Sequence, residues 1–311
     1  MMYIRFTCLL SLVLVVQNPV FAQYDTNPSE ELPSNGDKQL FQDIPSVFTA
    51  SKYEQKVSKA PASVSIVTAD EIKKWGYRNM GDILSSLKGF STTTDRNYGY
   101  VGTRGFGLPT DYNNRLLLLI DGHRYNDNVF EAVYVDENFP VDVDMIERVE
   151  VVRGPSSSLY GSNAVFGVIN VITKRGRDQD GANTKFSYGS FDTYKTSASY
   201  GKRFSNGLEA FVTGTFYDSQ GDDHFYSREF DNPATNNGVY ENNDEEQSKK
   251  VMGKLSYGDF TLEGVYLKRK KDIPTASFGT VFNDPRTNSF DQSAFIYLNH
   301  NHTFENQLNI Q

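Results

Sequence analysis

Histidines are the side chains of this 311-residue chain best suited to hold a metal ion, and the chain has four of them. His300 and His302 stand two residues apart in a segment whose pattern predicts a β-strand, so both should point to one face. A metal pair is one interpretation, but no third ligand accompanies them, and we expect polar residues of a strand wall. His123 follows a predicted turn, where we expect a structural or solvent-facing role. The sequence therefore predicts no metal site.

Two glycine-rich segments have the composition of phosphate-binding loops but lack the pattern. Gly154–Gly161 has the wrong spacing for a P-loop, and no Lys-Ser or Lys-Thr pair follows it. Gly102–Gly107 is not part of a strand–helix unit of the dinucleotide-binding type, and its glycines suit tight turns and close backbone approach. Because no nucleophile, base and orienting residue occur as a set, we predict neither an enzyme nor a cofactor.

The N-terminal residues read as a secretory signal, residues 1–22. Arg5 supplies the positive charge, Phe6–Val16 is an apolar stretch too short to cross a bilayer, and Val20-Phe21-Ala22 offers a cleavage site. The only cysteine, Cys8, lies inside this signal. The mature chain, starting near Gln23, then forms neither a disulfide framework nor a thiolate metal site.

Composition excludes two classes of protein. Elsewhere in the chain no run approaches 18 consecutive apolar residues, which excludes a helical membrane protein. The formal charge of −8, without a basic patch, argues against a nucleic-acid partner. The 19 tyrosines and 22 phenylalanines instead suit the aromatic girdles of a transmembrane β-barrel.

The elements that must position these residues begin after a polar, flexible leader, residues 23–43. Thr68-Ala69-Asp70-Glu71 is a capping box that predicts a helix running to Gly76. A second helix should start near Asn79 or Gly81 and end at Gly89 as a left-handed cap. The apolar run 116–120 predicts a strand that is covered on both faces.

The pattern changes after Gly176 to alternation of apolar and polar residues in segments of ~10 residues, which is typical of outer-membrane barrel strands. The predicted strands are Thr184–Tyr188, Thr193–Phe204, Leu208–Tyr217, Lys249–Tyr257, Phe260–Lys270 and Gln292–Phe304. The links that connect these strands at one end of the predicted wall are all short, whereas the links at the other end include the long segments 218–247 and 271–291. Short periplasmic turns and longer outer loops distinguish such barrels.

Four motifs in order resemble the TonB-dependent outer-membrane receptors. Ala60–Ile72 resembles the first strand and helix of that family's plug domain, and Gly102-Thr103-Arg104-Gly105-Phe106 its central element. Leu116–Gly122 resembles the following strand and turn. Ile146–Val152, Arg153–Ala164 and Val168–Lys174 resemble the end of the plug.

The resemblance implies an α+β plug domain, residues 59–176, followed by antiparallel transmembrane β-barrel strands, residues 177–311. The family's barrel has 22 strands, of which this chain holds about six or seven, so we expect a fragment with an incomplete barrel. An open edge in lipid would leave backbone groups unsatisfied. The implied location is the bacterial outer membrane, the implied activity is TonB-dependent import of a scarce solute, and we expect a monomer surrounded by outer-membrane lipid.

By the same resemblance, residues 44–58 form the TonB-box region and linker. The box itself is expected at Ile44, Pro45, Ser46, Val47, Phe48, Thr49 and Ala50. Pro45 blocks a helix, and the β-prone residues after it suit an extended peptide. Such a segment can add as a strand to the sheet of the partner, TonB. The alternative is an ordinary linker.

Further residues are singled out as plug–barrel contacts or ligand contacts. Arg104 and Arg153 could pair with Glu209 and Glu263 as a breakable lock between plug and barrel, or could satisfy local backbone carbonyls instead. Ligand contacts are expected on two apical segments, at Arg96, Asn97, Tyr98, Tyr100, Tyr125, Asn126, Phe130 and Tyr134.

Aromatic, amide and arginine side chains suit an iron chelate, and a ferric siderophore is the expected solute by family frequency. Cobalamin, an oligosaccharide or a peptide would fit these side chains as well. Two other classes stay open, a signal-transducing receptor and a passive porin or adhesion scaffold. The short leader argues against a signal-transducing receptor. The plug with its TonB box argues against a passive porin or adhesion scaffold.

Overall fold

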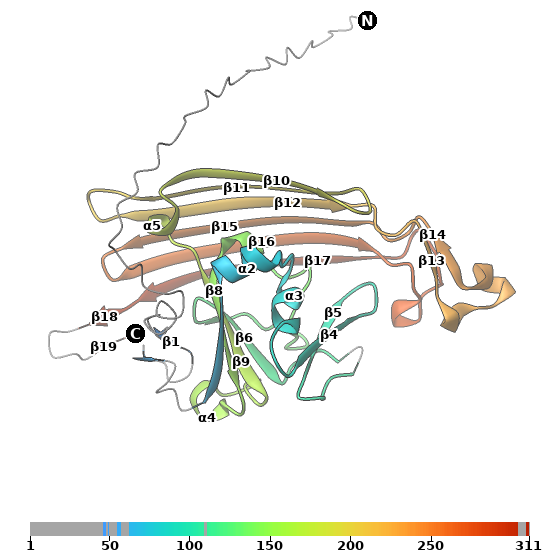
Figure 1. Ribbon diagram of the computed structural model, residues 1–311, viewed down its shortest axis with the longest axis horizontal. Helices are drawn as coiled ribbons and strands as arrows, with labels where there is room; N and C mark the ends of the chain where they lie inside the picture. Colours follow the sequence, from blue (N-terminus) through green and yellow to red (C-terminus); the bar gives the residue numbers. More distant parts are fainter. Residues whose placement is uncertain are drawn as a thin grey trace, which may run out of the picture. The chain divides into compact units, whose positions relative to one another are not determined.

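The computed structural model describes residues 46–47, 49, 55–56, 62–108, 111–303 and 309–310 (Figure 1). The chain divides into two compact units, residues 1–43 and 44–311, and every described residue belongs to the second. The predicted signal and leader lie outside the described residues, as do four members of the expected TonB box, Ile44, Pro45, Phe48 and Ala50. No helix in the described part of the chain is long and apolar enough to span a membrane.

The expected plug is built on a five-stranded sheet in the order β3-β8-β9-β6-β7. Its strands are β3 (Ser63–Thr68), β6 (Leu116–Ile120), β7 (His123–Arg124), β8 (Ile146–Arg153) and β9 (Gly167–Thr173). β6 and β9 pair in parallel, and the other neighbours are antiparallel. All five residues of β6 are buried, which confirms the prediction of a strand covered on both faces.

Two short helices follow β3. α2 (Ala69–Trp75) begins at the predicted capping box, in which Thr68 and Glu71 bond each other's backbone, and ends at Gly76 in the left-handed region. α3 (Met80–Ser85) begins at Asn79, whose side chain accepts a hydrogen bond from Asp82 N. The predicted end of this helix at Gly89 is wrong. Ser85 and Ser86 donate their hydroxyls to the carbonyls of Gly81 and Ile83, and the helix stops there.

The remaining plug elements are a hairpin and small pieces. β4 (Phe90–Thr94) and β5 (Gly99–Thr103) form a two-stranded hairpin, here called the apex hairpin, with residues 95–98 at its tip. β1 (Ser46–Val47) pairs with β2 (Gln55–Lys56). The short helices are η2 (Val143–Met145), α4 (Ser157–Tyr160) and α5 (Gly176–Gln179).

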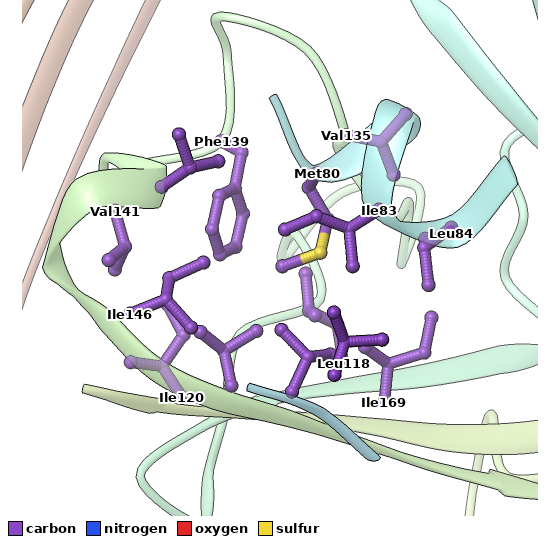
Figure 2. Close-up of a cluster of buried hydrophobic side chains, with 14 of the residues drawn as sticks. Met80, Ile83, Leu84, Leu118, Ile120, Val135, Phe139, Val141, Ile146 and Ile169 are labelled. Carbon is purple, nitrogen blue, oxygen red and sulfur yellow. The ribbon is translucent and has the colours of Figure 1, made fainter. Parts of the chain in front are cut away.

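Two apolar clusters hold the plug sheet between them. The larger joins α3 to the sheet, and Figure 2 shows Met80, Ile83 and Leu84 of α3 above Leu118 and Ile169 of the sheet. The smaller cluster takes the other side chains of β6, Leu117 and Leu119, together with Val152, Ala164, Val168 and Val47. The expected TonB-box residue Val47 is therefore part of the plug core.

The second half of the chain forms a six-stranded antiparallel sheet, here called the wall sheet, in chain order (Figure 1). Its strands are β10 (Gly181–Gly189), β11 (Thr193–Arg203), β12 (Glu209–Ser219), β15 (Glu246–Tyr257), β16 (Phe260–Asp272) and β17 (Asn288–His300). All six predicted strands are confirmed, each extended or shortened at its ends by at most four residues.

The predicted long outer segments contain structure of their own. The first holds β13 (His224–Tyr226) paired with β14 (Val239–Glu241) and the turns η3 (Arg228–Phe230) and η4 (Pro233–Gly238), and the second holds η5 (Ser277–Gly279). After the wall sheet, β18 (His302–Thr303) pairs with β19 (Asn309–Ile310).

The two faces of the wall sheet differ as the alternation predicted. One face exposes large apolar side chains, among them Phe186, Tyr200, Val212, Leu255, Leu262 and Ile296. The other face buries charged and hydroxyl side chains, among them Thr213, Lys250, Lys254, Glu263 and Arg269. An apolar outer face and a polar inner face are what a barrel wall in lipid requires.

Candidate functional site

The tip of the apex hairpin is tied to the wall sheet at the end where the long segments 220–245 and 273–287 connect its strands. Asn97 O accepts a hydrogen bond from Arg269 Nη2 at 2.6 Å, and Asn97 Oδ1 accepts one from Ser289 at 2.6 Å. The Tyr98 hydroxyl donates to Asp291 at 2.9 Å, and burial together with this carboxylate raises the pKa of Tyr98 to about 12. Tyr98 therefore stays a protonated donor at physiological pH.

Arg96, at the same tip, reaches the long outer segment that carries β13 and β14. Its guanidinium lies 3.0 Å from Asp244 and 3.6 Å from Asp222. The group also lies over the ring of Phe225, at 4.2 Å from the ring centroid. The charge that could have bound an anionic ligand is thus already shared by two carboxylates.

Apart from Asn126, the other expected ligand residues are three tyrosines that bond or stack on neighbouring side chains and one phenylalanine that is half exposed. Tyr100 donates its hydroxyl to Asp95, Tyr134 stacks on Tyr98, and Tyr125 forms a hydrogen bond with Ser293 of the wall. Phe130 is half exposed and stacks on Tyr112, with ring centroids 4.5 Å apart.

Asn126 differs from the expectation of a ligand contact, because it is buried. Both amide hydrogens bond backbone carbonyls, of Leu116 and Glu131, and its oxygen accepts from Leu118 N. It fixes the loop to β6 and presents no free donor to a solute.

A cavity of about 780 Å³ lies between α2, α3 and the apex hairpin on one side and the wall sheet on the other. Most of the residues that line it are of polar or charged types, including Asn79, Asn97, Asp136, Lys195, Asp244 and Arg269. A cavity of this size and polarity can hold water or a small solute beside the plug.

Asp136 lies on this cavity wall in unusually close contact with the apex hairpin. A Cβ atom on Gly99 would stand 2.2 Å from Asp136 Oδ2, so only glycine allows this approach. Burial, with the nearby charge of Glu246, raises the pKa of Asp136 to about 6, although Arg269 opposes the shift. The remaining acidic neighbours that face it are Glu137 and Asp82.

We expect Asp136→Asn to flatten the pH dependence of plug stability. A carboxyl whose pKa is higher in the folded state binds more protons folded than unfolded, so stability is lost as pH rises from about 4 to about 6. The rise in the pKa of Asp136 to about 6 sets an upper limit of about 3 kcal/mol on the stability that is lost. Unfolding midpoints at pH 5 and 7.5 check this, with Asp70→Asn, at an exposed position of α2, as control. An equally steep profile in Asp136→Asn would contradict it.

An acidic segment of the plug, residues 137–144, is bonded to lysines of three wall strands, and we call this the ionic seam. Glu137 pairs with Lys250 of β15 at 2.9 Å, Asp142 with Lys195 of β11 at 2.6 Å, and Asp144 with Lys185 of β10 at 2.7 Å. Burial would raise the pKa of Glu137, but the Lys250 ammonium holds that pKa below its ordinary value, helped by Lys195 and Ser248.

The expected pairing of Arg104 and Arg153 with Glu209 and Glu263 does not form. Glu209 pairs instead with Arg177, because α5 packs on β11 and β12 beside it. Glu263 lies 3.6 Å from Lys254, the residue opposite it on β15, which also bonds plug residue Asp121 at 2.7 Å. Arg153 donates to the carbonyl of Lys88, which agrees with the alternative that these arginines satisfy backbone carbonyls. Arg104 is exposed.

The described part of the expected TonB box is docked in the plug. Thr49 is buried, its amide donates to Glu150 Oε2 at 3.0 Å, and its hydroxyl bonds the same oxygen. The Thr49 hydroxyl accepts from Asn170 at 3.1 Å, and its carbonyl accepts from Tyr160 at 2.8 Å. Four bonds at one residue, beside buried Val47, hold this segment against the sheet.

The histidines take structural positions. His123 lies in β7, with its ring 4.7 Å from that of Tyr297 on the wall. His300 and His302 were predicted to lie on one strand, but β17 ends at His300 and His302 begins β18. His302 Nδ1 lies 2.7 Å from Asp259 Oδ2.

Comparison with known proteins connects this architecture to a family. Residues 56–168 match the family model of the TonB-dependent receptor plug domain. An iron-regulated outer membrane virulence protein of Vibrio cholerae is 34% identical over 145 residues, which cover 45% of this chain and 22% of that protein. The vitamin B12 transporter BtuB of Vibrio vulnificus is 32% identical over 180 residues, covering 57% and 28%. The chain thus matches about a quarter of the length of these relatives.

Solved structures extend the likeness to the wall sheet. The pyoverdine outer membrane receptor FpvA of Pseudomonas aeruginosa superposes with a TM-score of 0.63 at 17% identity, over 84% of this chain and 38% of that one. The alcaligin outer membrane receptor FauA of Bordetella pertussis gives 0.60 at 18% identity, over 85% and 40%. These likenesses show the fold alone. Residues 56–168 thus match the plug domain of TonB-dependent receptors, and the plug together with the wall sheet has the fold of part of the solved outer membrane receptors.

Proposed function

We propose that the receptor containing this chain imports a scarce solute across the outer membrane, with a ferric siderophore as the solute. The observation that carries the proposal is the plug, against which Val47 and Thr49 of the expected TonB box are docked. The likeness of this chain to an iron-regulated outer membrane protein supports an iron chelate as the solute. A corrinoid is the second candidate, supported by the likeness to a vitamin B12 transporter.

The proposed mechanism contains no covalent chemistry. The solute binds at the outer mouth, on the apex hairpin and the outer loops, and its binding shifts the population toward a released TonB box. TonB then adds that box to the edge of its own sheet and transmits the proton-motive force from its inner-membrane partners. The plug is remodelled, and the solute passes it.

Uptake measurements in an outer-membrane receptor deletion strain test this proposal. Cells that produce the receptor should accumulate one of a panel of radiolabelled ferric chelates, or radiolabelled cobalamin, only when TonB is present. Accumulation that persists without TonB would contradict energised import and favour a passive porin.

Thr49→Val is expected to release the docked segment without solute. Valine keeps the size of threonine but removes the hydroxyl that bonds Glu150 and Asn170. Losing such buried hydrogen bonds costs about 2 kcal/mol, or roughly 30-fold in the docked population. Retention of the solubilised receptor on immobilised periplasmic TonB should rise accordingly. Thr184→Val, at an exposed wall position, is the control, and equal retention of both variants would contradict the docking role.

A further inference from the structure

Two lysines face each other on the apolar face of the wall sheet, which is directed away from the plug. Lys249 of β15 and Lys268 of β16 are direct partners in the strand register, and both are exposed. The same row of the sheet continues with Phe216 of β12 beside Lys249 and with Gln292 of β17 beside Lys268. The row thus presents two ammonium groups and one amide to the surroundings of the wall, and neither lysine takes part in the ionic seam.

This row marks one border of the apolar band on that face. On β16 the outward side chains within Phe260–Tyr266 are apolar or glycine, and Lys268 is the next outward residue. On β15 the outward side chains within Val251–Tyr257 are likewise apolar or glycine, and Lys249 is the next one. Aromatic residues are typical of the level at which a barrel meets lipid headgroups, and Phe216 stands at this border. The two lysines therefore lie at headgroup level.

No carboxylate of the described residues forms an ion pair with either of these ammonium groups. Lys249 Nζ lies 5.7 Å from the ring centroid of Phe216. Lys270, the next outward lysine of β16, differs because Asp272 lies 2.9 Å from it. Like charges directly opposite each other on neighbouring strands destabilise a sheet. An anion from outside the chain would therefore offset a repulsion that the wall itself leaves in place.

We propose that Lys249 and Lys268, with the Gln292 amide beside them, bind a phosphate monoester of an outer-leaflet glycolipid. The row lies at the end of the wall where the segments 220–245 and 273–287 connect the strands, and long loops face outward in such barrels. Two ammonium groups match the charge of a phosphate monoester, about −1.5 to −2, more closely than the single charge of a phosphodiester phospholipid. The site faces lipid, so it does not depend on which solute the receptor imports.

Binding of a defined lipid to the purified receptor tests the site. The receptor containing this chain is delipidated in a neutral detergent and titrated with radiolabelled, bisphosphorylated lipid A. Lys249→Gln/Lys268→Gln should weaken binding roughly 30-fold, because each lysine near an anionic lipid surface contributes a factor of about five. Lys202→Gln is the matched control, since Lys202 is exposed on the same face at the opposite end of the wall sheet. Equal affinities of the double variant and the parent would overturn the proposal, as would an equal loss in the control.

Other forms of phosphate identify the ligand. The parent receptor should bind phosphatidylglycerol, and lipid A without its phosphates, about 10-fold or more weakly than bisphosphorylated lipid A. Undiminished binding of the dephosphorylated lipid would overturn the proposal, because the acyl chains alone would account for affinity. Equal binding of phosphatidylglycerol would overturn the choice of a glycolipid, and displacement of lipid A by millimolar inorganic phosphate would assign the site to free phosphate instead.

Thermal unfolding shows whether the double variant still folds. In lipid-free detergent it should unfold at the temperature of the parent or above, because the facing charges have been removed. Lipid A should then raise the unfolding temperature of the parent and of Lys202→Gln much more than that of the double variant. A double variant that unfolds well below the parent without lipid would contradict the proposal, because the lysines would then be needed by the sheet itself.

Discussion

Deleting residues 44–50 is expected to abolish energised uptake while the affinity of the receptor for its solute stays unchanged. The plug core retains β6, β8 and β9, and among the described residues the deletion removes Val47 alone from the smaller apolar cluster. The ligand candidates lie on the apex hairpin and the loop after β7, and none of their hydrogen bonds involves Thr49. The chain would lose the extended segment that TonB is proposed to capture, and with it the energy supply.

Two measurements are needed to separate loss of uptake from loss of binding in this deletion. Binding of a radiolabelled chelate to isolated outer membranes should match the parent receptor, while accumulation in energised cells falls to the level of a strain without TonB. Deleting seven residues of the preceding leader, 30–36, serves as a length control and should leave uptake intact. Normal accumulation in the 44–50 deletion would place the TonB box elsewhere in the chain.

Local signals predicted the elements well. The Thr68–Glu71 capping box needs only four residues to form, and the helix starts where the pattern placed it. The five apolar residues of β6 and the alternation of the wall strands follow from burial on two faces or on one. The end of α3 was missed because its serines bond backward to carbonyls, a competition that the position of Gly89 does not reveal.

The ion-pair partners of individual side chains were harder to predict from the sequence, because they depend on how two sheets face each other. Alternation placed Lys195 on the inner face of β11, but nothing local connects it to Asp142, 53 residues earlier. Glu209 and Glu263 were candidates to pair with Arg104 and Arg153, yet their partners proved to be Arg177 and Lys254. The acidic composition of residues 137–144 and the inward lysines were visible separately, and only the fold brings them together.

Lys250→Met is expected to loosen the plug more than any other single change in the ionic seam. Lys250 and Glu137 are both largely buried, with side chains 7% and 13% exposed. Removing the ammonium leaves the Glu137 carboxylate with Ser248 as its remaining close donor. Removing one partner of a buried ion pair typically costs about 3–5 kcal/mol, because the other charge stays buried without compensation.

The double variant Lys250→Met/Glu137→Gln separates that charge effect from lost packing. Glutamine keeps the shape of Glu137 and can still accept the Ser248 hydroxyl, so the double variant should recover most of the loss. Amide exchange across β8 and β9 reports the docking of the plug, with Lys249→Met, an exposed neighbour on the opposite face of β15, as the matched control. If exchange in Lys250→Met equals that of the control, the ionic seam contributes nothing to docking. If the double variant is as loose as the single one, packing of the lysine stem, and not the charge of Glu137, holds this side of the plug.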